Sequence, residues 1–335
     1  MLALYLPVIW AALIAIAVAL YVILDGFDLG IGILFPSTRK ESERDQMMNS
    51  IAPFWDGNET WLVLGGAGLL VAFPQAYAVI MPAMYLPVIV MLLALIFRGV
   101  SFEFRVVSKP NHRLWDIAFF GGSTVAAFAQ GIILGGLIQG ITVVDGRFGG
   151  NPFDWATPFA LLCGVGLVAG YALLGATWLI AKTDGEVQAR ARRQARVLLL
   201  IVLALIAVVS LWTPLSLQRI AERWFTPPNI WFLWPVPLIT AGLGWYVWRG
   251  LARAHDYTPF TGVIGLFVLA YLGLAISTFP YLVPPTLTIW DTAAVPESQI
   301  FTLLGTVVLL PIILGYFAFV FWTFRGKVRA GEGYH

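Results

Sequence analysis

Hydrophobic residues along this chain form long uninterrupted runs, and short polar segments separate each run from the next. A transmembrane helix needs about 20 mainly apolar residues, and nine runs reach or approach that length. Because the connections are short, the pattern predicts nine membrane crossings and no extramembrane domain. The runs lie at 5–35, 50–74, 78–98, 115–142, 156–181, 197–214, 229–249, 259–282 and 299–324.

Two places in this pattern leave the number of spans open. The run at 197–214 is the shortest, and the segment FPQAYAVIMP leaves only a tight, proline-bearing turn between the second and third runs. Misreading one pair of runs would give eight spans. Either number predicts an all-α polytopic membrane protein.

Composition supports this class. Hydrophobic residues make up 59% of the 335 residues and charged residues only 11%, whereas a soluble domain carries about 25% charged residues. Such a chain cannot cover itself with polar surface. The single cysteine, Cys163, excludes an intrachain disulfide, and no basic patch of the kind that binds nucleic acid is present.

The distribution of basic residues predicts the orientation in the membrane. With nine spans, alternate connections and the C-terminal tail hold all but three of the 20 lysines and arginines, and short loops rich in these residues stay in the cytoplasm. The pattern therefore predicts an N-terminus outside and a C-terminus in the cytoplasm. The three exceptions are Arg147, Arg219 and Arg223.

Four carboxylates lie inside otherwise apolar runs, and they are the strongest candidates for chemistry. Asp25 and Asp28 are three residues apart in the first run, and Asp56 and Glu59 are three apart in the second, so each pair shares one helix face. An ionisable residue inside a membrane helix costs about 2.5–3.5 kcal/mol and usually faces a bundle interior or a wet path. The predicted topology places both pairs in the cytoplasmic half of one hairpin, which favours a proton route.

A structural role for the same acids is the alternative. They could pair with Arg98 or Arg105, or cap helix starts, and an arginine partner would hold an acid ionised and oppose proton relay there. Trp55 and Asn58 supply hydrogen-bond partners for the acids or for water.

A second polar group follows the third run. Arg98, Glu103 and Arg105 lie in FRGVSFEFR, and Asp116 opens the fourth run. We expect an ion-pair network that fixes the hairpins at the cytoplasmic face.

Histidine usage argues against redox chemistry in this chain. His112, His255 and His335 all fall in predicted cytoplasmic loops or the tail, whereas membrane haem proteins supply histidine from within their helices. We therefore expect this chain to bind neither haem nor a catalytic metal. Small residues four apart, at Gly131–Gly135, Gly136–Gly140 and Gly166–Gly170, predict close helix packing instead.

Three strings together carry a family resemblance. DGFDLGIG, NSIAPFWDGNETWLVLGG and LIFRGVSFEFR, in this order and spacing, closely resemble subunit II of the cytochrome bd-type quinol oxidases. The length and nine-run pattern agree over nearly the whole chain, and the FWDGNETW form resembles the cyanide-insensitive branch of that family.

The resemblance implies a subunit of a bacterial inner-membrane complex that reduces O₂ to water with electrons from quinol. It implies that haems b and d sit in a partner, subunit I, that this chain stabilises that partner, and that small single-span accessory subunits can be present. It allows for a quinone bound by this chain. It also implies two four-helix bundles, within 1–142 and 156–282, plus a peripheral helix at 299–324.

The resemblance also ranks the candidate residues. The aspartate of the family's W-D-G-N motif, linked with a cytoplasmic proton path, is matched here by Asp56 beside Trp55. The second aspartate of the D-G-F-D motif is matched by Asp28, and the arginine at the end of the third helix by Arg98. Asp25 and Glu59 then provide polar surroundings.

Two other functional classes remain open from the residues alone. Intramembrane acids and glycine-rich helices are common in proton- or cation-coupled transporters, although here the acids cluster in one hairpin and the second half has no matching set. The third class is a purely structural assembly subunit, in which the acids are architecture.

Overall fold

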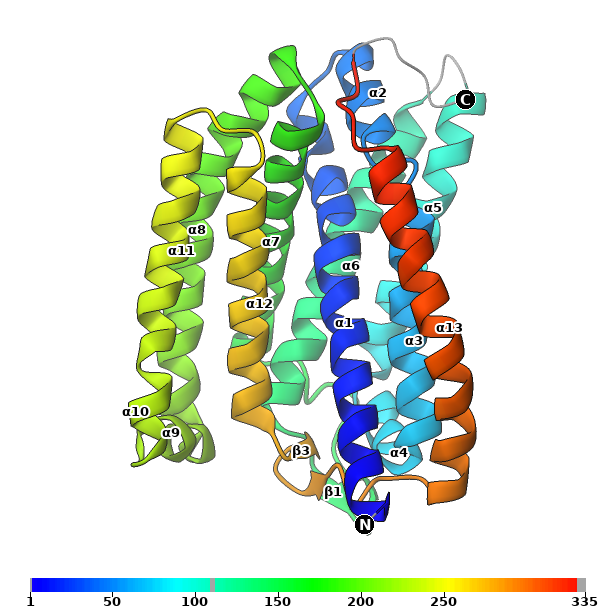
Figure 1. Cartoon of the computed structure of the whole chain (residues 1–335), viewed down its shortest axis with the longest axis vertical. Coiled ribbons are helices and arrows are strands. Elements are labelled where there is room, and N and C mark those ends of the chain that lie inside the picture. Colours follow the sequence, from blue (N-terminus) through cyan, green and yellow to red (C-terminus); the bar gives the residue numbers. More distant parts are fainter. Residues whose placement is uncertain (1, 109–111, 330–335) are drawn as a thin grey trace.

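The structure, a computed structural model, describes residues 2–108 and 112–329, and Figure 1 shows long helices standing side by side. The long helices are α1 (Leu2–Leu34), α3 (Trp55–Ala72), α5 (Tyr85–Val107), α6 (Arg113–Gln139), α7 (Pro158–Lys182), α8 (Gly185–Ser216), α11 (Pro235–Ala252), α12 (Thr258–Thr278) and α13 (Pro296–Thr323). The short elements are η1 (Phe35–Ser37), α2 (Glu41–Asn49), α4 (Pro74–Ala83), β1 (Val143–Val144), β2 (Arg147–Phe148), α9 (Gln218–Phe225), α10 (Asn229–Leu233), β3 (Tyr281–Val283) and β4 (Leu287–Thr288).

The predicted all-α membrane fold is confirmed. Within the described residues, eight helical segments are long and apolar enough to cross a membrane. The second predicted run, 50–74, corresponds to α3, an 18-residue helix that carries two acids and several glycines and is not among these eight segments. The nine apolar runs predicted from the sequence therefore correspond to the eight candidate spans together with α3.

The predicted tight turn after the second run is wrong. Residues 74–83 form a separate helix, α4, and the third span begins only at Tyr85. Pro74 accounts for the break, because proline lacks an N–H and disfavours helical geometry in the residue before it, yet fits the first turn of a new helix. Phe73, between α3 and α4, has φ −136° and ψ 61°, outside the helical region.

The sixth run was predicted too short. It forms α8, which has 32 residues and is about 48 Å long at 1.5 Å per residue. A bilayer core is about 30 Å thick, so the charged first turns of α8 extend the helix beyond the apolar run.

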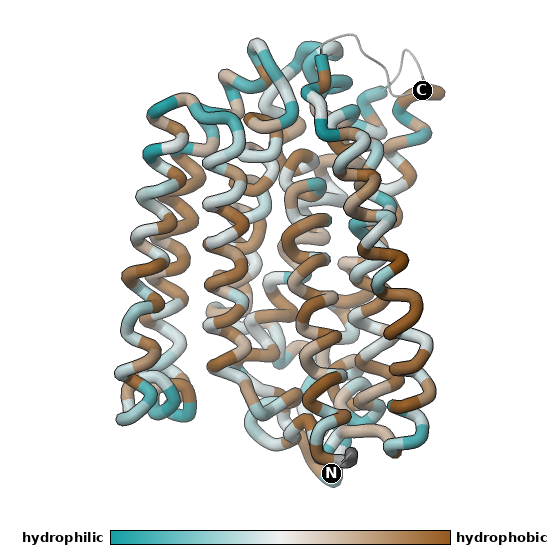
Figure 2. Tube along the Cα trace, viewed as in Figure 1, coloured by the Kyte–Doolittle hydropathy of each residue, from teal (hydrophilic) through white to brown (hydrophobic). Residues whose placement is uncertain are grey.

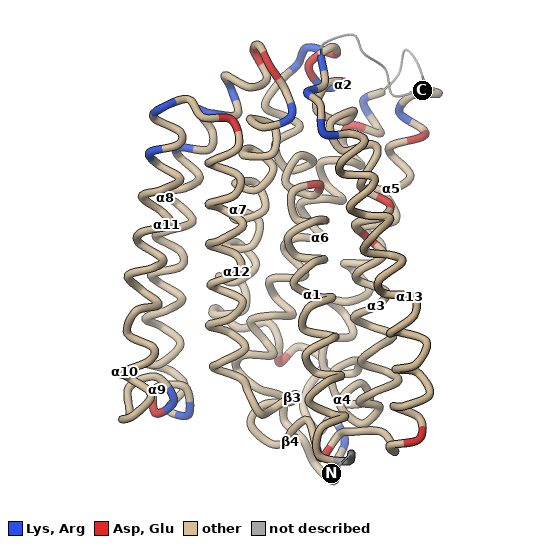
Figure 3. The backbone as a smooth tube through the Cα atoms, in the orientation of Figure 1, with Lys and Arg blue, Asp and Glu red and all other residues tan. Residues whose placement is uncertain are grey.

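Polar residues concentrate at the two ends of the molecule and apolar residues along its middle, as Figure 2 shows. We call the two ends the α2 end and the β-strand end, after the elements that lie there in Figure 1. Most lysines and arginines gather at the α2 end (Figure 3). Arg147, Arg219 and Arg223 lie in β2 and α9, at the β-strand end.

Helix α7 lies at the centre of the assembly and is the most buried of the spans, whereas α13 is the least buried. α7 packs against α1, α6, α8 and α12, while α13 contacts only α1 and α3 to any extent. α1 also packs against α3 and α6, and α5 against α6. The division into two four-helix bundles and a peripheral helix stays a prediction.

Glycines permit the closest helix crossings. A Cβ built on Gly30 of α1 would lie 1.9 Å from the backbone oxygen of Tyr171 in α7, and one on Gly175 would lie 2.4 Å from the Gly30 carbonyl carbon. The predicted pair Gly131–Gly135 plays the same role, because both residues would clash with α7 backbone if they bore a Cβ. Gly166 of another predicted pair faces open space.

This contact makes a test of the α1–α7 crossing. Gly30→Ala should lower the thermal unfolding midpoint of the purified protein, because forcing a methyl group against backbone in a packed interior costs about 1–3 kcal/mol. Gly66→Ala is the matched control, since no heavy atom lies within 4 Å of its Cβ position. Equal midpoints for the two variants would contradict the packing described for α1 and α7.

Candidate functional site

One fully buried arginine lies within ion-pair distance of three carboxylates inside the helix bundle. Arg98 of α5 is 0% exposed, as are Asp25 and Asp28 of α1. The Arg98 Nη2 atom lies 3.1 Å from Asp25 Oδ1 and 3.8 Å from Asp28 Oδ2, and Nη1 lies 3.3 Å from Glu59 Oε2 of α3. Three helices therefore meet at a single guanidinium.

Local packing places Arg98 against these acids. Gly122 of α6 lets α5 approach closely, because a Cβ there would lie 2.6 Å from the Ala94 oxygen and 3.0 Å from the Arg98 nitrogen. The guanidinium lies over the rings of Trp55 and Phe102, at 5.3 Å and 5.4 Å from their centroids. These two rings stack on each other at 4.6 Å. A cation over aromatic faces gains electrostatic stabilisation that is larger when water is excluded.

Asn58 joins the same cluster. Its side-chain nitrogen donates to Asp28 Oδ2 at 2.7 Å and to the Leu24 carbonyl at 3.4 Å. Both supporting residues proposed from sequence, Trp55 and Asn58, thus contact cluster members. We call Asp25, Asp28, Asn58, Glu59 and Arg98 the Arg98 cluster.

The Arg98 cluster is incompletely satisfied within the described chain. Four buried atoms have no hydrogen-bond partner: Asp25 Oδ2, Asp28 Oδ1, Asn58 Oδ1 and Arg98 Nε. Buried polar groups are normally paired with protein or ordered water. One guanidinium also balances only one of three carboxylates, and an unbalanced charge in a low-dielectric interior is expensive. The cluster therefore calls for bound protons, water or both.

The cluster is closed on most sides and opens through α3. The Glu59 side chain is 29% exposed, and Asp56, one turn earlier on α3, is exposed. Asp56 makes no ion pair with any described residue, so Glu59 is the α3 acid that contacts Arg98. Whether either acid moves protons stays a prediction.

Three polar side chains near the cluster are joined to one another by hydrogen bonds. Tyr21 lies one turn before Asp25 on the same face of α1. Gln130 of α6 donates to the Tyr21 hydroxyl at 2.7 Å and accepts from the Tyr171 hydroxyl of α7 at 2.8 Å. The sequence analysis did not predict these hydrogen bonds, because an isolated glutamine or tyrosine in an apolar run does not indicate its partners.

The second predicted polar group forms at the α2 end, with different members. Arg105 lies 2.8 Å from Asp116, as expected, and also 2.5 Å from both Glu41 and Asp45 of α2. Arg44 of α2 lies 2.6 Å from Asp116. The three α2 residues were missed, although their spacing in ESERDQ places them on one face of a short helix.

Glu103 does not join this network as predicted. It is exposed and forms no ion pair within the described residues. Glu103 and Arg105 are two positions apart in the sequence, which places their side chains on nearly opposite faces of α5.

Aromatic rings separate the two polar groups. Phe102, Phe119 and Phe35 form consecutive edge-to-face contacts, with centroids 5.3 Å and 4.9 Å apart. Phe35 in turn lies under the Arg105 guanidinium, and Phe102 lies under Arg98. Water that enters from the Arg105 network would have to pass this layer, whereas α3 gives the Arg98 cluster a lateral opening.

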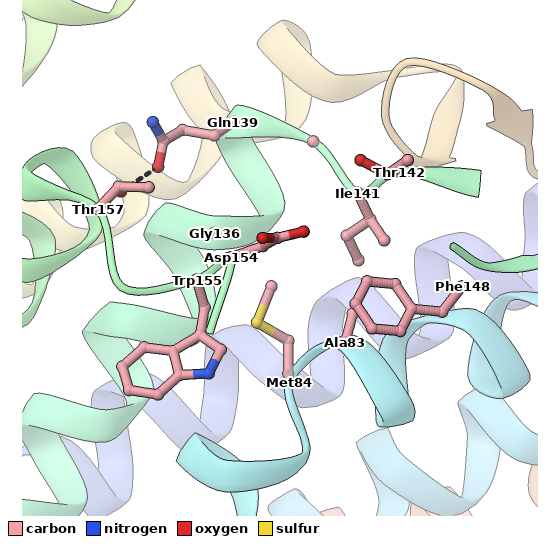
Figure 4. Close-up of a pocket in the computed structure, with 11 residues that line it drawn as sticks. Ala83, Met84, Gly136, Gln139, Ile141, Thr142, Phe148, Asp154, Trp155 and Thr157 are labelled. Atoms are coloured by element: carbon pink, nitrogen blue, oxygen red, sulfur yellow. Dashed lines mark hydrogen bonds between the residues drawn. The ribbon is translucent and has the colours of Figure 1, made fainter. Parts of the chain in front are cut away.

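A pocket lies at the β-strand end, and Figure 4 shows its lining. Three of its polar side chains are paired: Thr157 donates to Gln139, and Asp154 accepts from the Asn151 backbone N–H at 2.9 Å. The remaining lining is largely apolar, with Met84, Phe148 and Trp155 among the residues drawn in Figure 4. We assign no chemistry to it.

The two described histidines lie away from the bundle interior. His112 precedes α6 and His255 lies between α11 and α12, while His335 falls outside the described residues. Within the described ranges no group of three or more histidine, cysteine, aspartate or glutamate side chains is arranged to hold a metal ion.

The comparisons with known proteins agree on one family. The family model for cytochrome bd terminal oxidase subunit II matches residues 6–324. Cytochrome bd-I ubiquinol oxidase subunit 2 of Escherichia coli K12 is 31% identical, over 96% of this chain and 94% of that protein. Cytochrome bd ubiquinol oxidase subunit 2 of Bacillus subtilis is 33% identical over 63% of this chain and 65% of the relative.

A solved structure has the same fold. A chain in the structure of bd oxidase from Geobacillus thermodenitrificans superposes with a TM-score of 0.75 at 18% identity, covering 95% of this chain and 98% of that one.

Removing the central cation tests the electrostatics of the site. Arg98→Gln should strongly lower the yield of folded protein and its unfolding midpoint, because breaking a buried ion pair from one side costs about 3–5 kcal/mol. Adding Asp25→Asn to that variant should recover part of the loss, since one uncompensated acid is then gone. Glu103→Gln, which removes an exposed charge of α5, should leave the midpoint unchanged. A double variant no more stable than Arg98→Gln alone would argue against the Arg98–Asp25 pair.

Glu43 of α2 predicts a pH dependence. Its carboxylate accepts from Arg190 at 2.6 Å and from Thr38 at 2.5 Å, and these bonds lower the pKa of Glu43 from 4.5 to about 2. A lowered folded-state pKa stabilises the fold above the ordinary pKa, and this contribution is lost as the pH falls from about 4.5 to about 2. Glu43→Gln should therefore melt lower at neutral pH and lose less stability than the parent across that acid window. Parallel melting curves for the two proteins would refute the assignment.

Proposed function

This chain belongs to the cytochrome bd terminal oxidase subunit II family, and from that premise we propose that it is the haem-free companion of a haem-bearing subunit I. In this proposal the partner holds haems b and d and oxidises quinol, and the complex reduces O₂ to water in the bacterial inner membrane. The present chain stabilises that partner and supplies part of a proton path. The cyanide-insensitive branch, accessory subunits and a quinone on this chain remain predictions of the sequence resemblance.

The observation that supports the proton path is the Arg98 cluster. O₂ reduction consumes protons, and a membrane-embedded site needs groups that can exchange them. A lone guanidinium among three carboxylates, with four unpaired polar atoms, has acceptor sites for protons and for ordered water. Acids inside membrane helices typically mark proton relays.

Asp56 and Glu59 form the proposed entrance. They lie one turn apart on α3, and exposure decreases from Asp56 to Glu59 to the buried Asp25 and Asp28. A proton taken up at Asp56 would pass through water to Glu59 and then to the unpaired oxygens of the cluster. Arg98 holds Asp25 by the shortest of its three contacts, which favours Asp28 and Glu59 over Asp25 as carriers.

The exposed face of α3 is the proposed contact with subunit I. Asp56, Thr60, Val63, Ala67 and Leu70 repeat at intervals of three and four residues and are all exposed, which defines one unpartnered stripe. A partner on this stripe would cover the opening at Glu59 and take Asp56 into the interface. The path would then run between the two subunits.

The proposed topology places the α2 end in the cytoplasm and the N-terminus outside, because the basic residues gather at the α2 end. We further propose the two four-helix bundles and the peripheral α13 as the organisation of the chain. Protons drawn from the α2 side would then contribute to the membrane gradient.

A structural role is the second candidate, and the ion pairs of Arg98 favour it. In that case the acids neutralise Arg98 and join α1, α3 and α5, with no part in proton transfer.

Asp56→Asn in the complete two-subunit complex separates these candidates. We expect quinol oxidase turnover to fall about 10²–10⁴-fold if Asp56 donates protons in a rate-limiting step, while the haem absorption spectrum stays that of the parent. Glu103→Gln is the matched control, an exposed α5 acid without an ion pair in the described chain, and should keep full turnover. Loss of haem together with turnover would favour the structural role, and unchanged turnover would remove Asp56 from the path.

Co-expression tests the companion role itself. Haem spectra should appear in membranes only when subunit I is produced, and the haem-bearing subunit should accumulate only when this chain is present. A haem-free chain that catalyses proton-coupled uptake by itself in vesicles would instead support a transporter.

A further inference from the structure

Four arginines at one end of the hairpin formed by α8 and α11 have no carboxylate partner in the described chain. Arg193 and Arg196 of α8, Arg249 of α11 and Arg253 just after it are all exposed. The neighbouring arginines of α8 are neutralised, because Arg190 pairs with Glu43 and Arg192 with Asp256. We call the four unpaired residues the hairpin arginines.

The helix contacts bring the hairpin arginines together. Leu203 of α8 lies against Gly244 of α11, and Arg196 donates to the Leu251 carbonyl at 3.3 Å. Arg193 lies one turn from Arg196 on α8 and therefore shares its side of the helix. Arg249 and Arg253 are four residues apart and flank Leu251 in the sequence. All four residues thus lie at the same end of one helix pair.

The nearby acidic residues do not neutralise the hairpin arginines. Asp256 lies 2.5 Å from Arg192 and 2.6 Å from Lys327, so its carboxylate is already paired with other cations. Glu186 precedes Arg193 by seven residues, about 10 Å farther out along α8. Figure 3 shows the blue segments collected at this end of α8 and α11.

Aromatic side chains lie next to the hairpin arginines, on the side of the membrane interior. Trp245 is 62% exposed and lies one turn before Arg249 on the same face of α11, and Trp248 and Tyr246 are also exposed. Exposed tryptophan and tyrosine mark the membrane–water interface. The order along α11 is therefore apolar residues, aromatic rings at headgroup level, then unpaired guanidinium groups.

We propose that the hairpin arginines bind the phosphate of an anionic phospholipid in the adjacent leaflet. Arginine recognises phosphate through paired, charge-assisted hydrogen bonds, and basic surfaces between transmembrane helices are known binding places for anionic headgroups. The lipid's acyl chains would lie along α8 and α11 beside Trp245. This site is separate from the Arg98 cluster and does not depend on the proton path.

Lipid binding to the purified two-subunit complex tests the site. The complex is stripped of lipid in detergent and titrated with phosphatidylglycerol or with zwitterionic phosphatidylcholine, and bound lipid is counted by native mass spectrometry. The parent should bind phosphatidylglycerol more tightly than phosphatidylcholine. Arg193→Gln/Arg249→Gln should weaken phosphatidylglycerol binding about thirtyfold and leave phosphatidylcholine binding and the unfolding midpoint unchanged.

The control removes the same charge elsewhere. Arg39→Gln/Arg113→Gln replaces two exposed arginines that also form no ion pair among the described residues, and it should change phosphatidylglycerol binding less than threefold. An equal loss in this control would mean diffuse attraction to a basic surface and would overturn the site. Equal affinity for the two lipids would also overturn it, and so would displacement of phosphatidylglycerol by inorganic phosphate, which would assign the arginines to a free anion.

Discussion

The buried guanidinium of Arg98 is the interaction on which the polar interior of this protein depends. Without a cation, three carboxylates inside a membrane bundle could not stay charged, and with one cation they are only partly balanced. The Arg98 cluster is therefore both a joint between α1, α3 and α5 and a site with polar atoms that have no partner among the described residues. Under the proposed function, the same feature would both stabilise a subunit and exchange protons.

Close contacts between helices position the residues of the Arg98 cluster. Gly122 lets α5 approach α6 at the level of Arg98, and Gly30 lets α1 cross α7 two residues beyond Asp28. Aromatic rings lie between the Arg98 cluster and the Arg105 network, and Glu59 on α3 is the partly exposed member of the cluster. In the proposed complex, the contact with subunit I and the two acids Asp56 and Glu59 would lie on the same side of α3.

Much of this arrangement could be predicted from the sequence. Apolar run length gave the membrane helices, and the spacing of acids gave one face for Asp25 and Asp28. Helix α4 was missed because a proline can end one helix or begin another, and run length alone does not distinguish the two. The first turns of α8 were missed because charged residues outside the apolar run carry no hydropathy signal.

The choice between Asp56 and Glu59 could not be predicted from spacing, because both share a face of α3. Their depths differ by about one helical turn, and only the position of Arg98 on a third helix decides which acid reaches it. Glu103 was wrongly expected in an ion pair because Arg98 and Arg105 of α5 are buried, whereas Glu103 lies on the exposed side of the helix.

Infrared difference spectroscopy of the two-subunit complex, comparing its oxidised and reduced forms, tests the central claim most directly. If the Arg98 cluster holds an exchangeable proton, a carbonyl band of a protonated carboxylic acid changes on reduction, shifts in heavy water and disappears in Asp28→Asn or Glu59→Gln. A spectrum without such a band, or one unchanged in both variants, would show that the three acids stay ionised around Arg98 and serve only as structure.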